Sequence, residues 1–315
     1  MEIRGRRVRI IPPAGARSLI ADTTAWRYAP LPLAGPLELV LPRRAYFEYA
    51  FLDEKDRPFA DPEAAETAEN PWYPYAAAVR LEGALQPFAG VAELSGKVRR
   101  LRIGKRHVVV YEPPRPPRAC LLVFDGVAYY RIAKLAHVAE RLWRLGRISA
   151  LRVVFSEPLN RDEDYRFSDE LRRHVLREVV PEVTARFGGV ALRGLWGASL
   201  GGLAALWLGL EHGEVFSRVG AQSAALKAVV GGSDAWRDPE WLLQRYRESA
   251  AELDMVALQA GKIEWLLGAA RRFAAALADR GTPHEYREYP SGHNWYTWRL
   301  GLAEGLEDLF GVDLE

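Results

Sequence analysis

Ser199 is the residue of this sequence whose surroundings most clearly predict chemistry. It lies within Gly197–Gly201, a Gly-x-Ser-x-Gly pattern, between an apolar run at 190–196 and a longer apolar stretch at 199–213. A serine on a sharp turn between a strand and a helix presents its Oγ at the helix N-terminus, where the helix dipole and free amides favour negative charge. The pattern therefore predicts a nucleophile. The alternative is a serine that caps a glycine-rich helix start.

A serine hydroxyl needs a base, and the base needs an acid that orients it. Among the six histidines, His293 is the best candidate because it lies in a loop directly after the predicted strand 284–289. Glu264 follows the predicted strand 254–260 and supplies the acid. The chain order serine, acid, histidine is one of the known orders of a serine hydrolase triad.

Other interpretations of the acidic position stay open. Glu264 could instead be an acidic residue in the first turn of a helix, which the helix dipole favours. Asp254 precedes its strand and would lie at the wrong end of the sheet, while Asp234 and Asp238 are weaker candidates.

Two backbone amides must bind the oxyanion that forms during acyl transfer. The amide of Leu200, directly after the nucleophile, is the first candidate. We expect the second in the loop after an early strand, where the run "LLVFDG" places Gly126 and Val127. This chemistry requires neither a metal ion nor an organic cofactor, and we expect none.

The elements that must position these residues begin at about residue 95, where apolar strands alternate with helices. We predict strands over 106–113, 119–126, 149–157, 190–196, 216–223, 254–260 and 284–289. We predict helices over 131–146, 169–188, 199–213, 239–249 and 263–281, and one after Trp295. Such alternation predicts a mostly parallel sheet with helices on both faces.

The N-terminal region has a different pattern. Short apolar runs, rich in aromatic residues, are separated by proline, glycine and charged residues over the first 85 positions. This spacing is typical of a small β-sandwich. We therefore predict a small β-sandwich over 1–88 and an α/β domain over 89–315.

Composition narrows the class of partner. The chain has 315 residues, is 49% hydrophobic and carries a net charge of +2, so it can bury a large core and has no marked charge for nucleic acid or a membrane surface. The single cysteine, Cys120, excludes an internal disulfide. Without a recognisable secretion signal or a long apolar segment, we expect a cytoplasmic protein that acts on a small-molecule ester.

Several of these motifs together resemble the enterochelin (ferric-siderophore) esterases and, more distantly, esterase D and feruloyl esterases. The matching runs are "LLVFDG", "WGASLGG", "FSRVGAQS", "AGKIE" and "SGHNWYTWR". Residues 46–72 are similar to the N-terminal domain of that family and equally to the immunoglobulin-like sandwich of starch- and glycogen-branching enzymes, which implies an immunoglobulin-like sandwich over 1–88. The resemblance implies an α/β-hydrolase fold behind the sandwich. It also implies that Ser199, Glu264 and His293 are the triad.

The sequence departs from that family at two places. The family commonly has Gly-Gly-His-Asp-Trp, whereas this chain has Ser-Gly-His-Asn-Trp at 291–295. The family's arginine and Glu-Leu pairing also has altered spacing in "NRDEDYRFSDEL". The second departure lies where a substrate would be recognised.

The leading hypothesis is a serine carboxylester hydrolase that works through an acyl-enzyme, on a siderophore or a related ester or lactone. Arg131 and Arg161 are candidate substrate contacts, because guanidinium groups suit an anionic catecholate, and Trp295 is a third candidate. Alternatives are a carbohydrate or phenolic-acid (feruloyl or acetyl) esterase, an acyltransferase, and a non-catalytic carbohydrate-binding protein on an inactive hydrolase fold.

Overall fold

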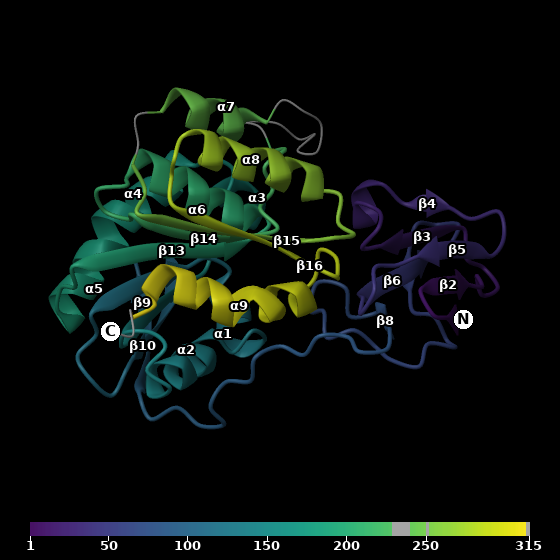
Figure 1. Ribbon diagram of the computed structural model, residues 1–315, viewed down its shortest axis with the longest axis horizontal. Helices are drawn as coiled ribbons and strands as arrows, with labels where there is room; N and C mark the ends of the chain where they lie inside the picture. Colours follow the sequence, from purple (N-terminus) through teal and green to yellow (C-terminus); the bar gives the residue numbers. More distant parts are fainter. Residues whose placement is uncertain (229–239, 250–251, 313–315) are drawn as a thin grey trace. The chain divides into compact units, whose positions relative to one another are not determined.

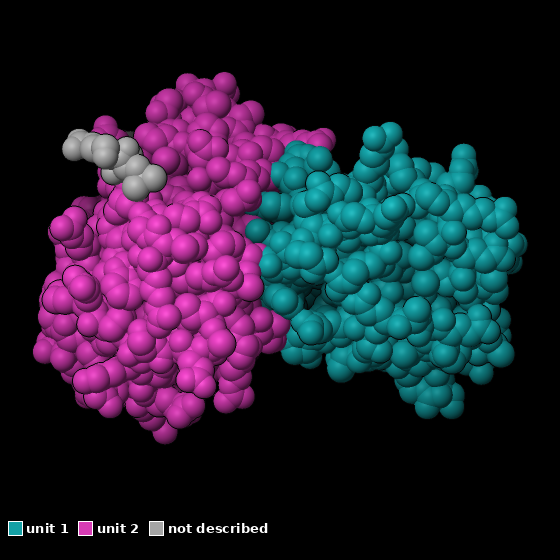
Figure 2. Space-filling model, turned by 60° about the horizontal axis from the view of Figure 1, so that its bottom comes forward, with its two compact units in different colours: residues 1–87, 260–267, 288–300 teal, residues 88–259, 268–287, 301–315 magenta. Residues whose placement is uncertain are grey.

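The computed structural model describes residues 1–228, 240–249 and 252–312. These residues form two compact units, coloured separately in Figure 2. Unit 1 contains residues 1–87 and two later segments, 260–267 and 288–300. Unit 2 contains the described residues of 88–259, 268–287 and 301–315.

The N-terminal part of unit 1 consists of short strands and one turn of 3₁₀-helix. Its elements are β1 (Glu2–Arg4), β2 (Arg7–Ile10), β3 (Ser18–Ala21), η1 (Trp26–Tyr28), β4 (Leu31–Pro32), β5 (Leu37–Val40), β6 (Tyr46–Leu52), β7 (Pro58–Phe59) and β8 (Ala77–Arg80). One antiparallel sheet has the order β1-β2-β5. The second has the order β4-β3-β6-β7, with β8 also paired to β6.

Strand β6 explains how unit 1 is layered, because all seven of its residues are buried. Successive side chains of a strand point to opposite faces. Phe47, Tyr49 and Phe51 pack in a core with Val8 and Ile10 of the other sheet, as in a sandwich. The second face of the same sheet is also covered.

That second face carries Tyr46, Ala50 and Leu52, which pack in a core with Tyr289 and Tyr296. The segment 288–300, which contains His293, therefore belongs to the same packed unit as the N-terminal sandwich. The position of this segment within unit 1 therefore depends on the fold of the sandwich.

Unit 2 follows the predicted alternation. Its first elements are β9 (Lys97–Ile103), β10 (Arg106–Glu112), β11 (Ala119–Val123), α1 (Gly126–Arg131), α2 (Leu135–Arg144), β12 (Leu151–Ser156), α3 (Arg161–Asp164), α4 (Asp169–His174), a π-helical segment η2 (Val175–Val179) and α5 (Val180–Phe187). The remaining elements are β13 (Leu192–Ala198), α6 (Leu200–Glu211), β14 (Arg218–Gln222), α7 (Trp241–Glu248), β15 (Met255–Gly261), α8 (Leu267–Asp279), β16 (His284–Tyr289) and α9 (Trp295–Phe310).

The described strands of this alternating region form one eight-stranded sheet with the order β16-β15-β14-β13-β11-β12-β10-β9. The pairs from β12 through β11, β13 and β14 to β15 are parallel, whereas β9 and β10 pair antiparallel at one edge. Helices α6 and α8 cover one face of the sheet, and α2 and α9 cover the other (Figure 1). The predicted mostly parallel sheet with helices on both faces is confirmed.

Three predicted helices differ from the observed ones. The one predicted over 131–146 corresponds to α2, which begins only at Leu135, because Arg131 ends the separate helix α1. The helix predicted over 263–281 begins only at Leu267, and the one predicted over 169–188 contains the π-helical segment η2 between α4 and α5. Contacts with a later segment explain the late start of α8, because the amides of Lys262 and Ile263 donate to the carbonyls of Tyr289 and Ser291. Within the described residues, no helix combines the length and apolar character needed to cross a bilayer.

Candidate active site

Ser199 stands between β13 and α6 in a strained backbone conformation, with φ 56° and ψ −122°. A non-glycine residue rarely adopts a positive φ, and such strain persists only where neighbouring structure imposes it. The amide of Ser199 donates to the Gln222 carbonyl at 2.9 Å, and its carbonyl accepts from the Ala225 amide at 2.9 Å. A Cβ on Gly197 would overlap the backbone of Gly201, so the turn needs glycine there.

The capping alternative for Ser199 does not describe this geometry. A capping serine has an extended backbone and accepts a hydrogen bond from an amide of the first turn. The side chain of Ser199 makes no such bond to α6. Its strained φ is instead that expected of a nucleophile turn.

Leu200 and Gly126 present backbone amides at the same edge of the sheet. Each is the first residue of its helix, α6 or α1, and the first amides of a helix have no intrahelical acceptor. The strands that precede these helices, β13 and β11, are parallel neighbours. The geometry of unit 2 thus brings two predicted oxyanion donors to adjacent strand ends.

Val127, the third predicted donor, is used differently. Its amide donates to the side-chain carboxylate of Glu157. Burial raises the pKa of Glu157. The Val127 amide is therefore already engaged, unlike a donor that waits for an oxyanion.

Asp125 and Arg161 form an ion pair close to the nucleophile turn. The Nε and Nη2 of Arg161 donate to the two carboxylate oxygens of Asp125, both at 2.8 Å. The Asp125 amide donates to the Tyr165 hydroxyl at 2.8 Å. A Cβ on Gly201 would lie 3.1 Å from the Asp125 carboxylate. The guanidinium predicted to hold a substrate anion therefore already neutralises a buried carboxylate.

Glu264 and His293 form the second part of the candidate site, within unit 1. The Nδ1 atom of His293 lies 3.6 Å from a carboxylate oxygen of Glu264. The side chain of Glu264 is fully buried, and 9% of the His293 side chain is exposed. The His293 ring also packs against Trp265 and Trp298, with ring centroids 4.5 and 5.3 Å away.

The position of Glu264 excludes the alternative that it is an acidic residue in the first turn of a helix. Because α8 begins three residues later, at Leu267, Glu264 does not lie in the first turn of a helix. The hydrogen bonds from Lys262 and Ile263 tie its loop to the loop that carries His293. These backbone contacts, which directly precede Glu264 and His293 in the two loops, hold the two loops together.

The other acidic candidates fit the role of the acid that orients His293 less well than Glu264 does. Asp254 precedes β15 and accepts a hydrogen bond from the Ser217 hydroxyl at 2.5 Å. Asp234 and Asp238 lie outside the described residues. Within those residues, no group of three or more His, Cys, Asp or Glu side chains is arranged to hold a metal ion.

The remaining predicted substrate contacts differ in exposure. Arg131 is exposed at the end of α1, whereas Trp295 is buried at the start of α9. Trp295 packs with Trp298 and with Trp72, whose ring centroid lies 5.3 Å from both. Trp72 is 37% exposed and is the accessible member of this cluster. Sequence reasoning missed Trp72 because its partners lie more than 200 positions away along the chain.

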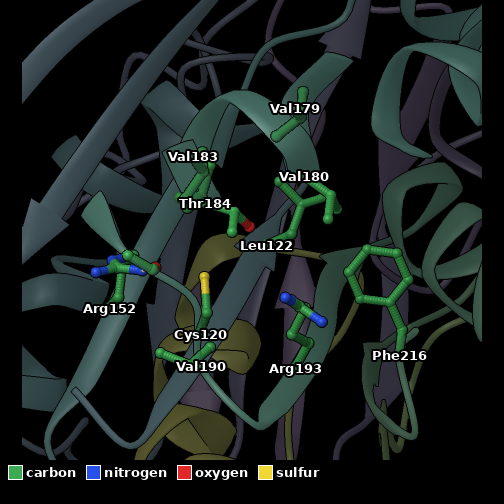
Figure 3. A pocket seen from close by; sticks show the side chains of 12 residues that line it. Cys120, Leu122, Arg152, Val179, Val180, Val183, Thr184, Val190, Arg193 and Phe216 are labelled. Atoms are coloured by element: carbon green, nitrogen blue, oxygen red, sulfur yellow. The ribbon is translucent and has the colours of Figure 1, made fainter. Parts of the chain in front are cut away.

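A small pocket in unit 2 lies towards the amino ends of β11, β12 and β13 (Figure 3). Cys120, Arg152 and Arg193 line it, and each is the second residue of its strand. Ligands of parallel α/β sheets bind beyond the carboxyl ends of the strands, where Ser199 lies. Burial also raises the pKa of the Cys120 thiol to about 12, which keeps it protonated and unreactive. This pocket is therefore not the candidate active site.

A family model named Esterase, described as "Putative esterase", matches residues 103–309. A ferric enterobactin esterase from Salmonella typhimurium is similar with a TM-score of 0.74 and 16% identity, over 96% of this chain and 92% of that one. An enterochelin esterase from Shigella flexneri gives a TM-score of 0.73 and 19% identity, over 96% and 91%.

A ferulic acid esterase gives a TM-score of 0.55 and 18% identity, over 69% of this chain and 98% of that one. A search of curated proteins finds no match to the chain. The fold is that of the enterobactin esterases, an α/β-hydrolase fold behind a β-rich N-terminal region, as the sequence predicts.

Proposed function

The chain belongs to the Esterase family of carboxylic ester hydrolases, and we propose that it works through an acyl-enzyme formed on Ser199. In this proposal His293 removes the proton of the Ser199 hydroxyl as the Oγ attacks the ester carbonyl. Glu264 orients the imidazole and stabilises its cationic form. The alcohol then leaves with the proton from His293, and water resolves the acyl-enzyme by the same route.

The amides of Leu200 and Gly126 are proposed to bind the oxyanion of each tetrahedral intermediate. Both lie at helix N-termini, where the helix dipole also favours negative charge. The observation that carries the proposal is the strained φ of 56° at Ser199, on a turn where the residue makes no helix-capping bond. The pairing of His293 with Glu264 at 3.6 Å is the second support.

For the substrate, we propose a siderophore lactone or a related ester. The support is the fold likeness to enterobactin esterases over 96% of the chain, which includes the N-terminal sandwich. Arg131 is the candidate contact for an anionic catecholate, because its guanidinium is exposed one short helix away from Gly126. Arg161 is not proposed as a contact, since Asp125 engages it.

A phenolic-acid ester is the second candidate. The fold likeness to a ferulic acid esterase favours it, although that likeness spans only 69% of the chain. An exposed indole such as Trp72 suits an aromatic acid or a sugar ring as well as a catechol. The two candidates differ in the bond cleaved, a lactone of a cyclic triester or a single ester to a sugar.

A substrate panel tests the proposal. We expect the purified full chain to hydrolyse enterobactin or its ferric complex with a higher kcat/KM than feruloyl or acetyl sugar esters. A higher kcat/KM for the feruloyl esters would replace the siderophore by the phenolic substrate. Absence of hydrolysis with every ester, including p-nitrophenyl acetate, would contradict the enzymatic proposal, and glycogen binding by the same protein would then favour the carbohydrate-binding alternative.

A further inference from the structure

Asp22 is a fully buried carboxylic acid that the proposed reaction does not use. It directly follows β3, and its relative exposure is 0%. It lies beside the segment 288–300, although 272 positions of sequence separate it from Asn294. All the contacts that follow lie within unit 1.

The carboxylate of Asp22 contacts both neighbours of His293. Its Oδ2 accepts a hydrogen bond from Asn294 Nδ2 at 2.7 Å and another from the Glu48 amide at 2.7 Å. On the other side of the histidine, a Cβ on Gly292 would overlap the Asp22 side chain. The residues before and after His293 are therefore both fitted against one acidic side chain.

Asn294 transmits this contact to α9. Its Oδ1 accepts the amide of Thr297 at 2.9 Å, so the side chain caps the helix that begins at Trp295. The Thr297 hydroxyl in turn donates to the Gly292 carbonyl at 2.6 Å. The side chain of Asn294 thus links Asp22 to the start of α9, and the bond from Thr297 to Gly292 spans the position of His293.

Keeping a carboxyl group at this position is unfavourable for stability. Burial, followed by the nearby Glu48, raises the pKa of Asp22 well above its usual value. Its Oδ1 atom is buried and has no hydrogen-bond partner among the described residues. A buried polar group with an unsatisfied atom costs stability, which an apolar residue of similar size would avoid.

We propose that Asp22 is a positioning residue that holds the loop of His293 through Asn294 and Gly292. The inference rests on the proposed function, since it assigns Asp22 to the orientation of the proposed base. In this account the N-terminal sandwich contributes directly to catalysis. It supplies the acceptor that fixes the histidine loop.

Asp61 provides a matched control in the same sandwich. It is also a buried carboxylate, at 7% exposure, and it accepts hydrogen bonds from the Tyr49 hydroxyl at 2.5 Å and the Glu63 amide at 2.9 Å. Those partners belong to the sandwich rather than to the segment 288–300. Asp22→Ala and Asp61→Ala therefore remove the same group from the same unit, and only the first removes a contact to the histidine loop.

The first experiment compares kcat and KM of these variants with p-nitrophenyl acetate, alongside thermal unfolding. Because a small displacement of a catalytic group lowers the rate strongly, we expect Asp22→Ala to lower kcat about 10- to 100-fold with KM within about twofold. We expect Asp61→Ala to leave kcat within about twofold of the wild type. Equal losses in the two variants, or an unchanged kcat in Asp22→Ala, would overturn the inference.

Two conservative variants keep the test informative if Asp22→Ala does not fold. Asp22→Asn keeps an oxygen that can accept from both Asn294 Nδ2 and the Glu48 amide, whereas Asn294→Asp removes the donor to Asp22 and keeps the helix cap. We expect Asp22→Asn to keep kcat within about threefold of wild type and Asn294→Asp to lower it at least about 10-fold. Equal losses of kcat in these two variants would exclude the Asp22 to Asn294 contact as the means of positioning.

An NMR measurement separates this inference from the proposed function. The six histidines give few ring signals, and His293→Gln identifies that of His293. We expect Asp22→Ala, but not Asp61→Ala, to shift or broaden that signal, whether or not the protein hydrolyses the test ester. An unmoved His293 signal contradicts the positioning role alone, whereas a wild-type protein without esterase activity contradicts only the proposed function.

Discussion

His293 Nδ1 and a carboxylate oxygen of Glu264 lie 3.6 Å apart, in two loops joined by backbone hydrogen bonds from Lys262 and Ile263. The pair has the arrangement of a base with its orienting acid, and the acid is fully buried. The chemistry proposed for Ser199 depends on this pair.

Substitution of the acid is expected to lower the rate without removing the base. Because Glu264→Gln leaves the imidazole in a less suitable tautomer, we expect kcat to fall about 10³- to 10⁴-fold. Steady-state hydrolysis of p-nitrophenyl acetate measures this. Asp254→Asn is the control, because Asp254 precedes β15 and bonds to Ser217. A larger loss of kcat in Asp254→Asn than in Glu264→Gln would contradict the role of Glu264 and indicate that Asp254, at the opposite end of β15, is the acid.

The ion pair of Asp125 and Arg161 predicts a stability effect. Arg161→Ala leaves the buried carboxylate of Asp125 without its partner, and we expect the free energy of unfolding to fall by about 3 kcal/mol. The exposed Arg131→Ala should change it by less than about 0.5 kcal/mol. Urea unfolding gives both values. If the two arginine variants lose the same stability, Asp125 does not need neutralisation.

The buried Glu48 predicts how stability depends on pH. Burial raises its pKa to about 7 from the usual 4.5, so between these values the folded protein holds a proton that the unfolded chain has released. Stability therefore falls as pH rises through this window, on the order of 3 kcal/mol in total. The ionisable groups that face Glu48 are Asp22, Tyr46, Glu66 and Glu69.

Urea unfolding of wild type and Glu48→Gln at pH 5 and pH 8 tests this prediction. Glutamine keeps an acceptor for Asn70 Nδ2, which bonds to Glu48 at 2.8 Å. We expect the wild type to lose more stability than the variant between the two pH values. Parallel losses in both proteins would show that Glu48 ionises with an ordinary pKa.

Cys120 predicts that the enzyme is insensitive to thiol reagents. Burial raises the pKa of its thiol to about 12, and the residue lies at the amino end of β11, away from Ser199. Iodoacetamide at pH 8 should leave the folded protein unmodified, and Cys120→Ser should keep the wild-type kcat. Loss of activity on alkylation of the wild type, with protection in Cys120→Ser, would place the thiol near the reaction.

The sequence predicts best what local pattern decides. The nucleophile turn at Ser199 and the alternation of strands and helices depend on neighbouring residues, and the structure has both. The order of Ser199, Glu264 and His293 also leads to the Glu264 to His293 pair. These features need no information about distant contacts.

The sequence predicts less well what distant contacts decide. The alternation of its strand predicts that Glu48 is polar and faces outward. A segment about 240 positions later covers that face of the sheet instead. The sequence predicts Arg161 as an anion-binding side chain. It does not show that Asp125, 36 positions away, is the partner of Arg161. Glu264 reads as a helix start because its apolar neighbours suit a helix, whereas bonds to Tyr289 and Ser291 hold it in a loop.

The most direct test of the nucleophile is covalent labelling with a fluorophosphonate probe, followed by mass spectrometry of the modified peptide. We predict one stoichiometric label on Ser199, absent in Ser199→Ala and strongly slowed in His293→Ala. Label on another residue, equal labelling of Ser199→Ala, or no label on the folded wild-type protein would contradict it.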